Sequence, residues 1–267
     1  MSTQIHATAL VDSAVDLGAE VSVGPYAIIE SGCVIGDHCE VRAHAVLCKG
    51  TLMGPHNQIG YGAVIGAEPQ DLGYKGGRSW VEIGSGNKIR EYATIHRATK
   101  EESATSIGNN NFIMCGVHVG HDGVIGNGTI LANNTLLAGY VEVEDGVFLG
   151  GGTVVHQHAR IGTLAITRGG TRVGKDVPPY FMAVDVNEVS GINRIGLRRA
   201  GLSHETRRAI QAAFELLYRS NLNVTQAVEE LRHKFHVPEI AHLVDFIRKS
   251  KRGICRGYRD RHVEDED

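Results

Sequence analysis

Aliphatic residues recur at every sixth position of the chain, without a gap from Ile5 to Ile65 and in the same phase as far as Val173. A helix repeats every 3.6 residues and a simple strand every 2, so neither element explains the period. Six residues per unit predict a parallel β-helix, in which each unit is a short strand plus a tight turn. Three units close a coil of about 18 residues, and coils stack about 4.8 Å apart. The uninterrupted run consists of Ile5, Val11, Leu17, Val23, Ile29, Ile35, Val41, Leu47, Met53, Ile59 and Ile65.

The period is broken at a few places that carry information. Asp71, Gly77, Glu101 and Thr167 occupy positions where an aliphatic residue is due. These breaks predict two protruding loops, around residues 67–80 and 98–105. Long excursions from a solenoid usually serve binding.

The pattern stops after Val173 at the segment DVPPY, whose consecutive prolines cannot join a ladder of hydrogen bonds. Helical periodicity follows. Ser203 is a suitable N-cap for a helix that runs to Arg219, and two more helices are predicted over 225–235 and 238–249. We therefore expect a mainly β chain with two domains: a parallel β-helix over residues 1–185 and a small helical domain over 186–267.

Composition and charge narrow the class of protein. The chain has 34 glycines against 6 phenylalanines and one tryptophan, which favours many tight turns over bulky core layers. No apolar run is long enough for a membrane span and the start lacks a signal-peptide pattern, so we expect a cytoplasmic protein without an integral membrane segment. The five cysteines form no CxxC pair, which indicates reduced, buried thiols instead of disulfides or a zinc ribbon.

Charge is unevenly distributed between the two predicted parts. Residues 1–177 carry a net charge of −5 and residues 178–267 carry +2, or +6 without the acidic residues 264–267. A basic segment of this kind is either a solvated surface or a docking site for an acidic partner. The candidate docking residues are Arg248, Lys249, Lys251, Arg252 and Arg256.

The stretch HVGHD, His118 to Asp122, concentrates polar chemistry in a region otherwise rich in glycine, asparagine and aliphatic residues. Three interpretations compete: a general base with an orienting acid, a metal site, or polar residues in a turn. A general base must lie within hydrogen-bond reach of the proton that it removes, and an imidazole that titrates near neutral pH suits that task.

Several segments, taken in order, resemble one known family. The hexapeptide period, QDLGY, TIHR, NNNFIMCGVHVGHDGVIGN, VVHQ, DVPPY and GLRRAG are similar to the UDP-N-acetylglucosamine acyltransferases that begin lipid A biosynthesis. The resemblance implies a left-handed β-helix, an exception to the usual right-handed crossover, in a homotrimer with active sites between subunits. It implies transfer of a 3-hydroxyacyl group from acyl carrier protein to the 3-position of a UDP-linked N-acetylglucosamine, with no metal, small cofactor or nucleic acid involved.

The resemblance also assigns site residues. His121 matches the catalytic base, Asp122 and Asp71 are joint candidates for orienting the imidazole or the sugar hydroxyls, and His118 matches a second histidine of the site. Gly139 matches the backbone N–H donor to the oxyanion. Independently of the family, Gly139 lies one coil beyond His121, so the period itself places its backbone beside the base.

Further positions match substrate contacts of the family. His156 and Gln157 match residues that face the acyl-phosphopantetheine arm and the nucleotide, and Gln70 lies in the QDLGY loop. Asn193 and Arg199 match uridine- and phosphate-binding positions, where a guanidinium suits a diphosphate. Gly169 matches the position that closes the acyl groove and would leave room for a long chain. Each of these polar residues could instead be an ordinary surface or capping residue.

The chain departs from the commonest family pattern near the expected sugar site. Gly73 stands where a lysine is usual, with Lys75 the nearest lysine, while Tyr140 replaces a histidine and Ile195 a glutamate. Some relatives with QDLG acylate the 3-amino analogue of the sugar. The acceptor is therefore either the 3-hydroxyl sugar, with Lys75 reaching back, or the 3-amino sugar. Acyl chain length stays open as well.

Other classes of function fit less well. A zinc enzyme of the carbonic anhydrase type could use His118, His121 and His156, but their spacing differs from that family's pattern. An ice-binding β-helix would need a flat face of repeated threonines, which the sequence lacks. An acetyl-CoA-dependent sugar acetyltransferase is the nearest alternative within the same fold.

Overall fold

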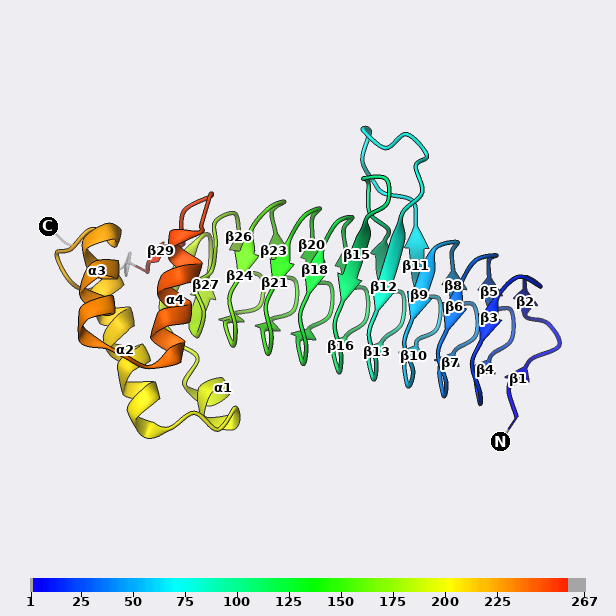
Figure 1. The fold of residues 1–267 in the computed structure, drawn as a ribbon, viewed down its shortest axis with the longest axis horizontal. Helices are drawn as coiled ribbons and strands as arrows, with labels where there is room; N and C mark the ends of the chain where they lie inside the picture. Colours follow the sequence, from blue (N-terminus) through cyan, green and yellow to red (C-terminus); the bar gives the residue numbers. More distant parts are fainter. Residues whose placement is uncertain (1, 259–267) are drawn as a thin grey trace, which may run out of the picture.

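The computed structural model describes residues 2–258, which form a long β-helix followed by a cluster of helices. Figure 1 shows the coils stacked along one axis, with the N-terminus at one end and helices α1–α4 at the other. Strands are parallel along each of three sheets, and strand n pairs with strand n + 3 through most of the coils. The predicted left-handed parallel β-helix with a small C-terminal helical region is confirmed.

The three sheets are built from very short strands. The first sheet holds β1 (Gln4–Ile5), β4 (Ser22–Val23), β7 (Glu40–Val41), β10 (Gln58–Ile59), β13 (Lys88–Ile89), β16 (Phe112–Ile113), β19 (Ile130–Leu131), β22 (Phe148–Leu149) and β25 (Ile166–Thr167). The second holds β2 (Leu10–Val11), β5 (Ile28–Ile29), β8 (Val46–Leu47), β11 (Val64–Ala67), β14 (Thr94–His96), β17 (His118–Val119), β20 (Leu136–Leu137), β23 (Val154–Val155) and β26 (Arg172–Val173). The third holds β3 (Asp16–Leu17), β6 (Val34–Ile35), β9 (Thr51–Met53), β12 (Trp80–Ile83), β15 (Ala104–Ile107), β18 (Val124–Ile125), β21 (Glu142–Val143) and β24 (Arg160–Ile161).

The aliphatic residues of the six-residue period form the core. In most two-residue strands the first side chain points outward and the second is buried, as in β5, where Ile28 is exposed and Ile29 is buried. Stacked inward side chains remove apolar surface from water along the whole axis. Ile5, in the first coil, remains 49% exposed because no coil lies below it.

One corner of the β-helix turns through residues with left-handed backbone conformation. Asp122, Tyr140 and His158 have φ angles of 57°, 60° and 62°, and they occupy equivalent turns of successive coils. Non-glycine residues adopt this conformation at a cost. These turns connect the second sheet to the third, and they carry the candidate site.

Two loops interrupt the coils where the period predicted them. One connects β11 to β12 over residues 68–79, and the other connects β14 to β15 over residues 97–103. Both project from the same side of the β-helix in Figure 1. Thr167, by contrast, marks no loop: its side chain is buried in β25 and its hydroxyl accepts a hydrogen bond from the amide of Gly150 (2.9 Å). Thr167 thus occupies an inward position that is usually aliphatic, and its hydroxyl is hydrogen-bonded there.

The ladder continues somewhat beyond Val173, where the sequence predicted its end. Val177, within DVPPY, forms a parallel bridge with Ile161. After the prolines, β27 (Phe181–Val184) pairs with β25 and then turns back antiparallel to β28 (Glu188–Ile192), which pairs with β29 (Arg256–Gly257). The prolines interrupt the ladder locally, since they lack N–H donors, without ending the sheet. The predicted domain boundary at 185/186 falls in the turn between β27 and β28.

Four helices complete the described chain. They are α1 (Arg194–Arg199), α2 (His204–Tyr218), α3 (Val224–Lys234) and α4 (Pro238–Arg248). Ser203 caps α2 by accepting a hydrogen bond from the amide of Thr206, as predicted, and Pro238 begins α4. The sequence did not predict α1, which is only six residues long.

The five cysteines are free thiols in the structure. Cys33, Cys39 and Cys255 are buried, while Cys48 and Cys115 are half-buried. Burial raises the pKa of Cys33 to about 11, so this thiol stays protonated and packs as a small apolar group.

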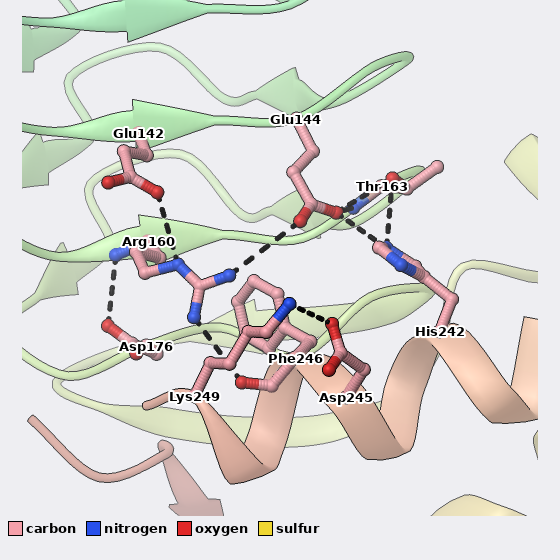
Figure 2. Close-up of polar contacts among 9 residues, drawn as sticks. All are labelled: Glu142, Glu144, Arg160, Thr163, Asp176, His242, Asp245, Phe246 and Lys249. Atoms are coloured by element: carbon pink, nitrogen blue, oxygen red, sulfur yellow. Dashed lines mark hydrogen bonds and ion pairs between the residues drawn. The ribbon is translucent and has the colours of Figure 1, made fainter. Parts of the chain in front are cut away.

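A polar network fixes α4 against the last coils of the β-helix (Figure 2). Glu144 accepts hydrogen bonds from the amide and hydroxyl of Thr163 (2.7 and 2.8 Å) and pairs with His242 Nε2 of α4 (2.8 Å). Beside this pair, the Arg160 guanidinium lies 4.2 Å from the ring centroid of Phe246. Cation–π and ionic contacts therefore bind the helices to the coils.

The Glu144–His242 pair predicts a pH dependence of stability. The hydrogen bond to Glu144 raises the pKa of His242 against the opposing effect of burial. Burial alone would raise the pKa of Glu144, but hydrogen bonds from His242 and Thr163 outweigh it and lower that pKa. A histidine whose pKa is raised in the folded state stabilises the fold at low pH, and this stabilisation is lost as pH rises through the folded-state pKa. A carboxyl group whose pKa is lowered stabilises the fold at higher pH, and this stabilisation is lost as pH falls through the folded-state pKa. The pair therefore stabilises most between about pH 5 and 6.5.

We expect His242→Ala to lower the free energy of unfolding by about 1 kcal/mol at pH 6, a figure reduced for the partial exposure of the pair. The difference from the unmutated protein should shrink between pH 7 and 8.5, because His242 then loses its charge in both states. Urea unfolding of both proteins at a series of pH values measures this difference in the free energy of unfolding. His236→Ala, which alters an exposed histidine next to α4, is the matched control. A pH-independent difference for His242→Ala would contradict the prediction.

Candidate active site

His121 lies at the corner between the second and third sheets, directly after β17 and Gly120. Its Nδ1 is 2.8 Å from Oδ2 of Asp122. The two residues lie in a turn, where the left-handed conformation of Asp122 (φ 57°) lets its carboxylate meet the imidazole.

Asp71 approaches the same imidazole from the other side. Its Oδ2 lies 4.0 Å from Nε2 of His121, and its Oδ1 accepts a hydrogen bond from the amide of Gly73 (2.8 Å). The two candidate carboxylates therefore face different ring nitrogens. A carboxylate on Nδ1 favours the tautomer with hydrogen on Nδ1, which leaves the lone pair of Nε2 free to accept a proton.

Gly139 lies directly against the His121 ring, as the spacing of one coil predicted. A Cβ atom at Gly139 would fall 2.5 Å from both Cε1 and Nε2 of His121. The following amide, of Tyr140, donates to the carbonyl of His121 (2.9 Å) and holds the two turns together. Within residues 2–258, the Gly139 N–H has no backbone acceptor, so it can serve an external oxygen.

Two further histidines border His121, and both are held uncharged. Burial, helped by the neighbouring rings of His96 and His121, lowers the pKa of His118 to about 4. Its Nδ1 is 2.8 Å from the hydroxyl oxygen of Thr94. Burial also lowers the pKa of His96, whose Nδ1 lies 2.6 Å from the carbonyl oxygen of Glu68. At neutral pH these rings add hydrogen-bonding capacity without adding positive charge.

A groove runs along the outer side of the second sheet beside His121. Its first part is a cavity of about 310 Å³, lined by Gln70, His96, His118, Gly120, His121, Leu136, Leu137, Ala138, Gly139, Val154, Val155 and Gln157. An adjoining cavity of about 530 Å³ shares Ala138, Val154, Val155 and Gln157 and adds His156, Arg172, Val173, Gly174, Val186 and Asn187. An apolar floor with polar groups near His121 suits a chain with a reactive end.

The structure thus brings most of the predicted residues together. Gln70, His118, His121, Gly139 and Gln157 line one cavity, Asp122 and Asp71 flank His121, and His156 lines the adjoining cavity.

The other four predicted residues lie elsewhere in the chain. Gly169, in the turn after β25, and Lys75, exposed in the first loop, line neither cavity. Asn193 caps α1: its Oδ1 accepts from the amide of Gly196 (3.0 Å) and its Nδ2 donates to the carbonyl of Leu164 (2.8 Å). Arg199 is exposed in the last turn of α1, which lies on the side of the β-helix opposite to the two loops in Figure 1.

Sequence reasoning missed several contacts of the site. His96 lines the cavity, and Thr94 and Thr99 place hydroxyl groups 2.8 Å from His118 and His121. The TIHR segment and the phase break after it were visible signals for this region. They could not show which side chains turn toward HVGHD, because that depends on how the coils stack.

Among residues 2–258, no three or more histidine, cysteine, aspartate and glutamate side chains are arranged to hold a metal ion. None of the four described helices has the length and apolar character needed to cross a bilayer.

A coiled hexapeptide repeat with a histidine–carboxylate pair beside an apolar groove defines a hexapeptide-repeat acyltransferase. The model "Bacterial transferase hexapeptide (six repeats)" matches residues 14–49 and 104–139, and the model "Udp N-acetylglucosamine O-acyltransferase; Domain 2" matches residues 176–255. The chain belongs to the acyl-(acyl-carrier-protein)–UDP-N-acetylglucosamine O-acyltransferase family.

Individual relatives show how far this similarity extends. The chain is 49% identical to the O-acyltransferase of Ectopseudomonas mendocina over 95% of its own length and 100% of the relative's. The identity to the O-acyltransferase of Thermodesulfovibrio yellowstonii is 42%, and the match covers 95% of this chain and 99% of the relative. The UDP-N-acetylglucosamine acyltransferase structure from Bacteroides fragilis matches with a TM-score of 0.91 at 41% identity, covering 95% of this chain and all of that one.

Proposed function

We propose that the protein transfers a 3-hydroxyacyl group from acyl carrier protein to the 3-hydroxyl of UDP-N-acetylglucosamine, the first step of lipid A biosynthesis, with His121 as the general base. The observation that carries the proposal is the position of His121 Nε2, at the lining of a groove, while Nδ1 is bound by Asp122. The family relationship supplies the substrates. We propose that the reaction takes place in the cytoplasm.

The chemistry follows from the positions of these groups. The sugar hydroxyl oxygen attacks the thioester carbonyl carbon while His121 Nε2 takes the hydroxyl proton. The Asp122 carboxylate stabilises the imidazolium that forms, and the N–H of Gly139 donates to the oxyanion. The C–S bond then breaks, and the departing thiolate takes the proton from the imidazolium. The thioester arrives activated, so the sequence of steps needs no resident cofactor.

We propose that the active enzyme is a homotrimer with sites between subunits. Exposed apolar side chains follow the outer face of the second sheet, including Leu10 (66% exposed), Leu136 (43%) and Val154 (44%). Their burial between subunits would be favourable. Arg199 lies on α1, on the side of the β-helix opposite to the loops of its own chain (Figure 1), so a partner's α1 would have to supply this guanidinium. Light scattering should give three times the chain mass of 28.8 kDa.

A second acceptor is favoured by one feature of the site. Asp71 and Asp122 place two carboxylates around His121, His96 and His118 are uncharged, and Gly73 supplies no cation. These groups are compatible with the amine of a 3-amino UDP-sugar. A lysine at position 73 would repel the protonated amine by about 1 to 4 kcal/mol at 4 Å.

One experiment tests both acceptors. The protein is incubated with a panel of acyl carrier protein thioesters and with the two UDP-sugars in competition, and products are identified by mass spectrometry. We expect O-acyl UDP-N-acetylglucosamine as a product. A kcat/KM tenfold higher for the hydroxyl sugar would exclude the amine as the preferred acceptor, and no transfer to either sugar would overturn the proposed function. Metal analysis of the active protein tests the expected absence of a metal.

The docking of acyl carrier protein gives a prediction about salt. Of the five basic candidates, Lys249 pairs with Asp245 (2.7 Å), Arg256 pairs with Glu188 (2.7 Å), and Arg252 donates to the carbonyl of Gly174 (2.9 Å). Arg248 and Lys251 remain exposed. Since exposed charge pairs weaken with screening, KM for the acyl donor should rise severalfold between low salt and about 0.5 M salt.

A double variant distinguishes an effect on docking of the acyl donor from an effect on binding of the UDP-sugar. Arg248→Glu combined with Lys251→Glu should raise KM for the acyl donor and reduce its salt dependence, with KM for the UDP-sugar unchanged. If KM for the acyl donor does not respond to salt in the unmutated enzyme, docking on this basic surface is wrong.

A further inference from the structure

Thr99, in the loop between β14 and β15, makes two contacts with the catalytic pair. Its hydroxyl oxygen lies 2.8 Å from Nδ1 of His121, and its amide donates to Oδ2 of Asp122 (3.0 Å). The same Oδ2 is 2.8 Å from Nδ1 of His121. We propose that Thr99 is a positioning residue, whose hydroxyl and amide together hold the imidazole and the carboxylate in the arrangement that catalysis requires. This inference rests on the proposed role of His121 as the base.

The geometry explains why two contacts matter more than one. Asp122 alone fixes the distance between carboxylate and Nδ1, but the imidazole could still swing about that single hydrogen bond. The Thr99 hydroxyl adds a second point near the same nitrogen, and the Thr99 amide fixes the carboxylate oxygen that both share. A base displaced by even about 1 Å can lose much of its effect on rate.

Thr99 is itself held in place by the residue that precedes it. The preceding residue, Ala98, is buried; its amide donates to the carbonyl of Trp80 (3.3 Å), and its carbonyl accepts from the hydroxyl of Ser79 (2.5 Å). Ser79 ends the first protruding loop, which also carries Asp71. The two loops thus meet beside Thr99, and both bear on His121.

The following residue secures the loop on the other side. The Lys100 ammonium lies 5.7 Å from the centroid of the Tyr140 ring, and that ring stands edge-on to His121 at 5.3 Å between centroids. A loop anchored at Ala98 and at Lys100 presents Thr99 in one place, which is what a positioning role demands.

A positioning role predicts a specific kinetic signature. Thr99 lines neither cavity of the groove, and its hydroxyl lies against Nδ1 of His121, the ring nitrogen that does not take the substrate proton in the proposed reaction. Thr99→Val keeps the shape and the backbone amide and removes only the hydroxyl. We therefore expect kcat to fall about tenfold with both KM values within twofold of the unmutated enzyme, because only a group that aligns the base is lost.

Two further variants separate positioning from folding. Thr99→Ser restores a hydroxyl at the same place and should recover at least half of kcat. Ser103→Ala removes a hydroxyl from the same loop whose partner is the Lys100 carbonyl instead of His121, and it should leave kcat within twofold. Thermal unfolding of all three variants shows whether any loss of activity follows a loss of structure.

The double variant tests whether Thr99 acts through His121. In the His121→Ala background, Thr99→Val should lower the residual rate by less than twofold, since there is no imidazole left to position. A tenfold further loss there would overturn the inference. So would a Thr99→Val enzyme with more than half of the original kcat, a rise in KM at constant kcat, or a Thr99→Ser enzyme as impaired as Thr99→Val.

These outcomes are distinct from failure of the proposed function. If His121→Ala keeps high activity, the assignment of the base is wrong and the inference falls with it. If His121→Ala is inactive while Thr99→Val is normal, His121 remains the base and only the role of Thr99 is refuted.

Discussion

Replacing His121 with alanine is expected to lower kcat by about 10²- to 10⁴-fold, the usual contribution of a general base. The imidazole is the group whose Nε2 faces the groove while Nδ1 is bound by Asp122, and alanine offers no substitute. The side chain lies at a corner outside the aliphatic core, so the fold should persist. Steady-state rates with an acyl carrier protein thioester, together with light scattering and thermal unfolding, measure both parts of this prediction.

His6→Ala provides a matched control. His6 is exposed in the first coil, with its Nδ1 bonded locally to Thr8, and it lies at the far end of the β-helix from the groove. This variant should keep its full rate. A His121→Ala enzyme that retained more than a tenth of the original kcat would remove His121 from the role of base, whatever its stability.

The second large effect is expected from Gly139→Ala. A Cβ at Gly139 would lie 2.5 Å from Cε1 and Nε2 of His121, far inside contact distance. The backbone there is compatible with alanine, so the side chain that it meets must move, and that side chain is the imidazole of His121, the proposed base. We expect a loss of kcat of about 100-fold, of the size caused by misplacing a reacting group by about 1 Å, with little change in the unfolding temperature.

Gly151→Ala tests whether the effect is specific. Gly151 lies in a tight turn of the next coil at a different corner, between β22 of the first sheet and β23 of the second, and a Cβ there meets only the carbonyl oxygen of Asn133, at 3.3 Å. We expect this variant to keep at least a third of the original kcat. Comparable losses in both variants would mean that any methyl group in these turns disturbs the enzyme, and the close approach of Gly139 to His121 would not be the cause.

The repetitive part of the fold could be predicted from the sequence because its cause is local and repeated. Each coil must place one aliphatic side chain per face into a narrow core, so the period of six appears directly in the chain, and Ile29, Ile65 and Ile95 are all buried as the period requires. The same regularity placed Gly139 beside His121. Helix α2 was predictable for a related reason, since its N-cap Ser203 lies next to the helix that it caps.

The composition of the site was less accessible to sequence reasoning. The resemblance supplied most of the residues that line the groove, because a family motif identifies residue types at fixed places in the chain. It did not indicate that the Asn193 amide is occupied in capping α1, or that three of the five basic docking candidates contact other parts of the chain. The partners of Arg252 and Arg256 lie 78 and 68 residues away, and no local pattern encodes them. The Asn193 cap and the Lys249–Asp245 pair are local contacts, but a motif match does not show them.

The sequence by itself determined the coil, its inward residues and the two loops, and it singled out His121 as the candidate base. The tertiary structure decided how that histidine is held. Asp122 binds Nδ1 because its turn has a left-handed backbone, and Asp71 faces Nε2 because a loop folds over the corner. Thr99 reaches His121 from 22 residues away through the stacking of one coil on another. Such contacts depend on where loops settle against stacked coils, and a one-dimensional period contains no information about that packing.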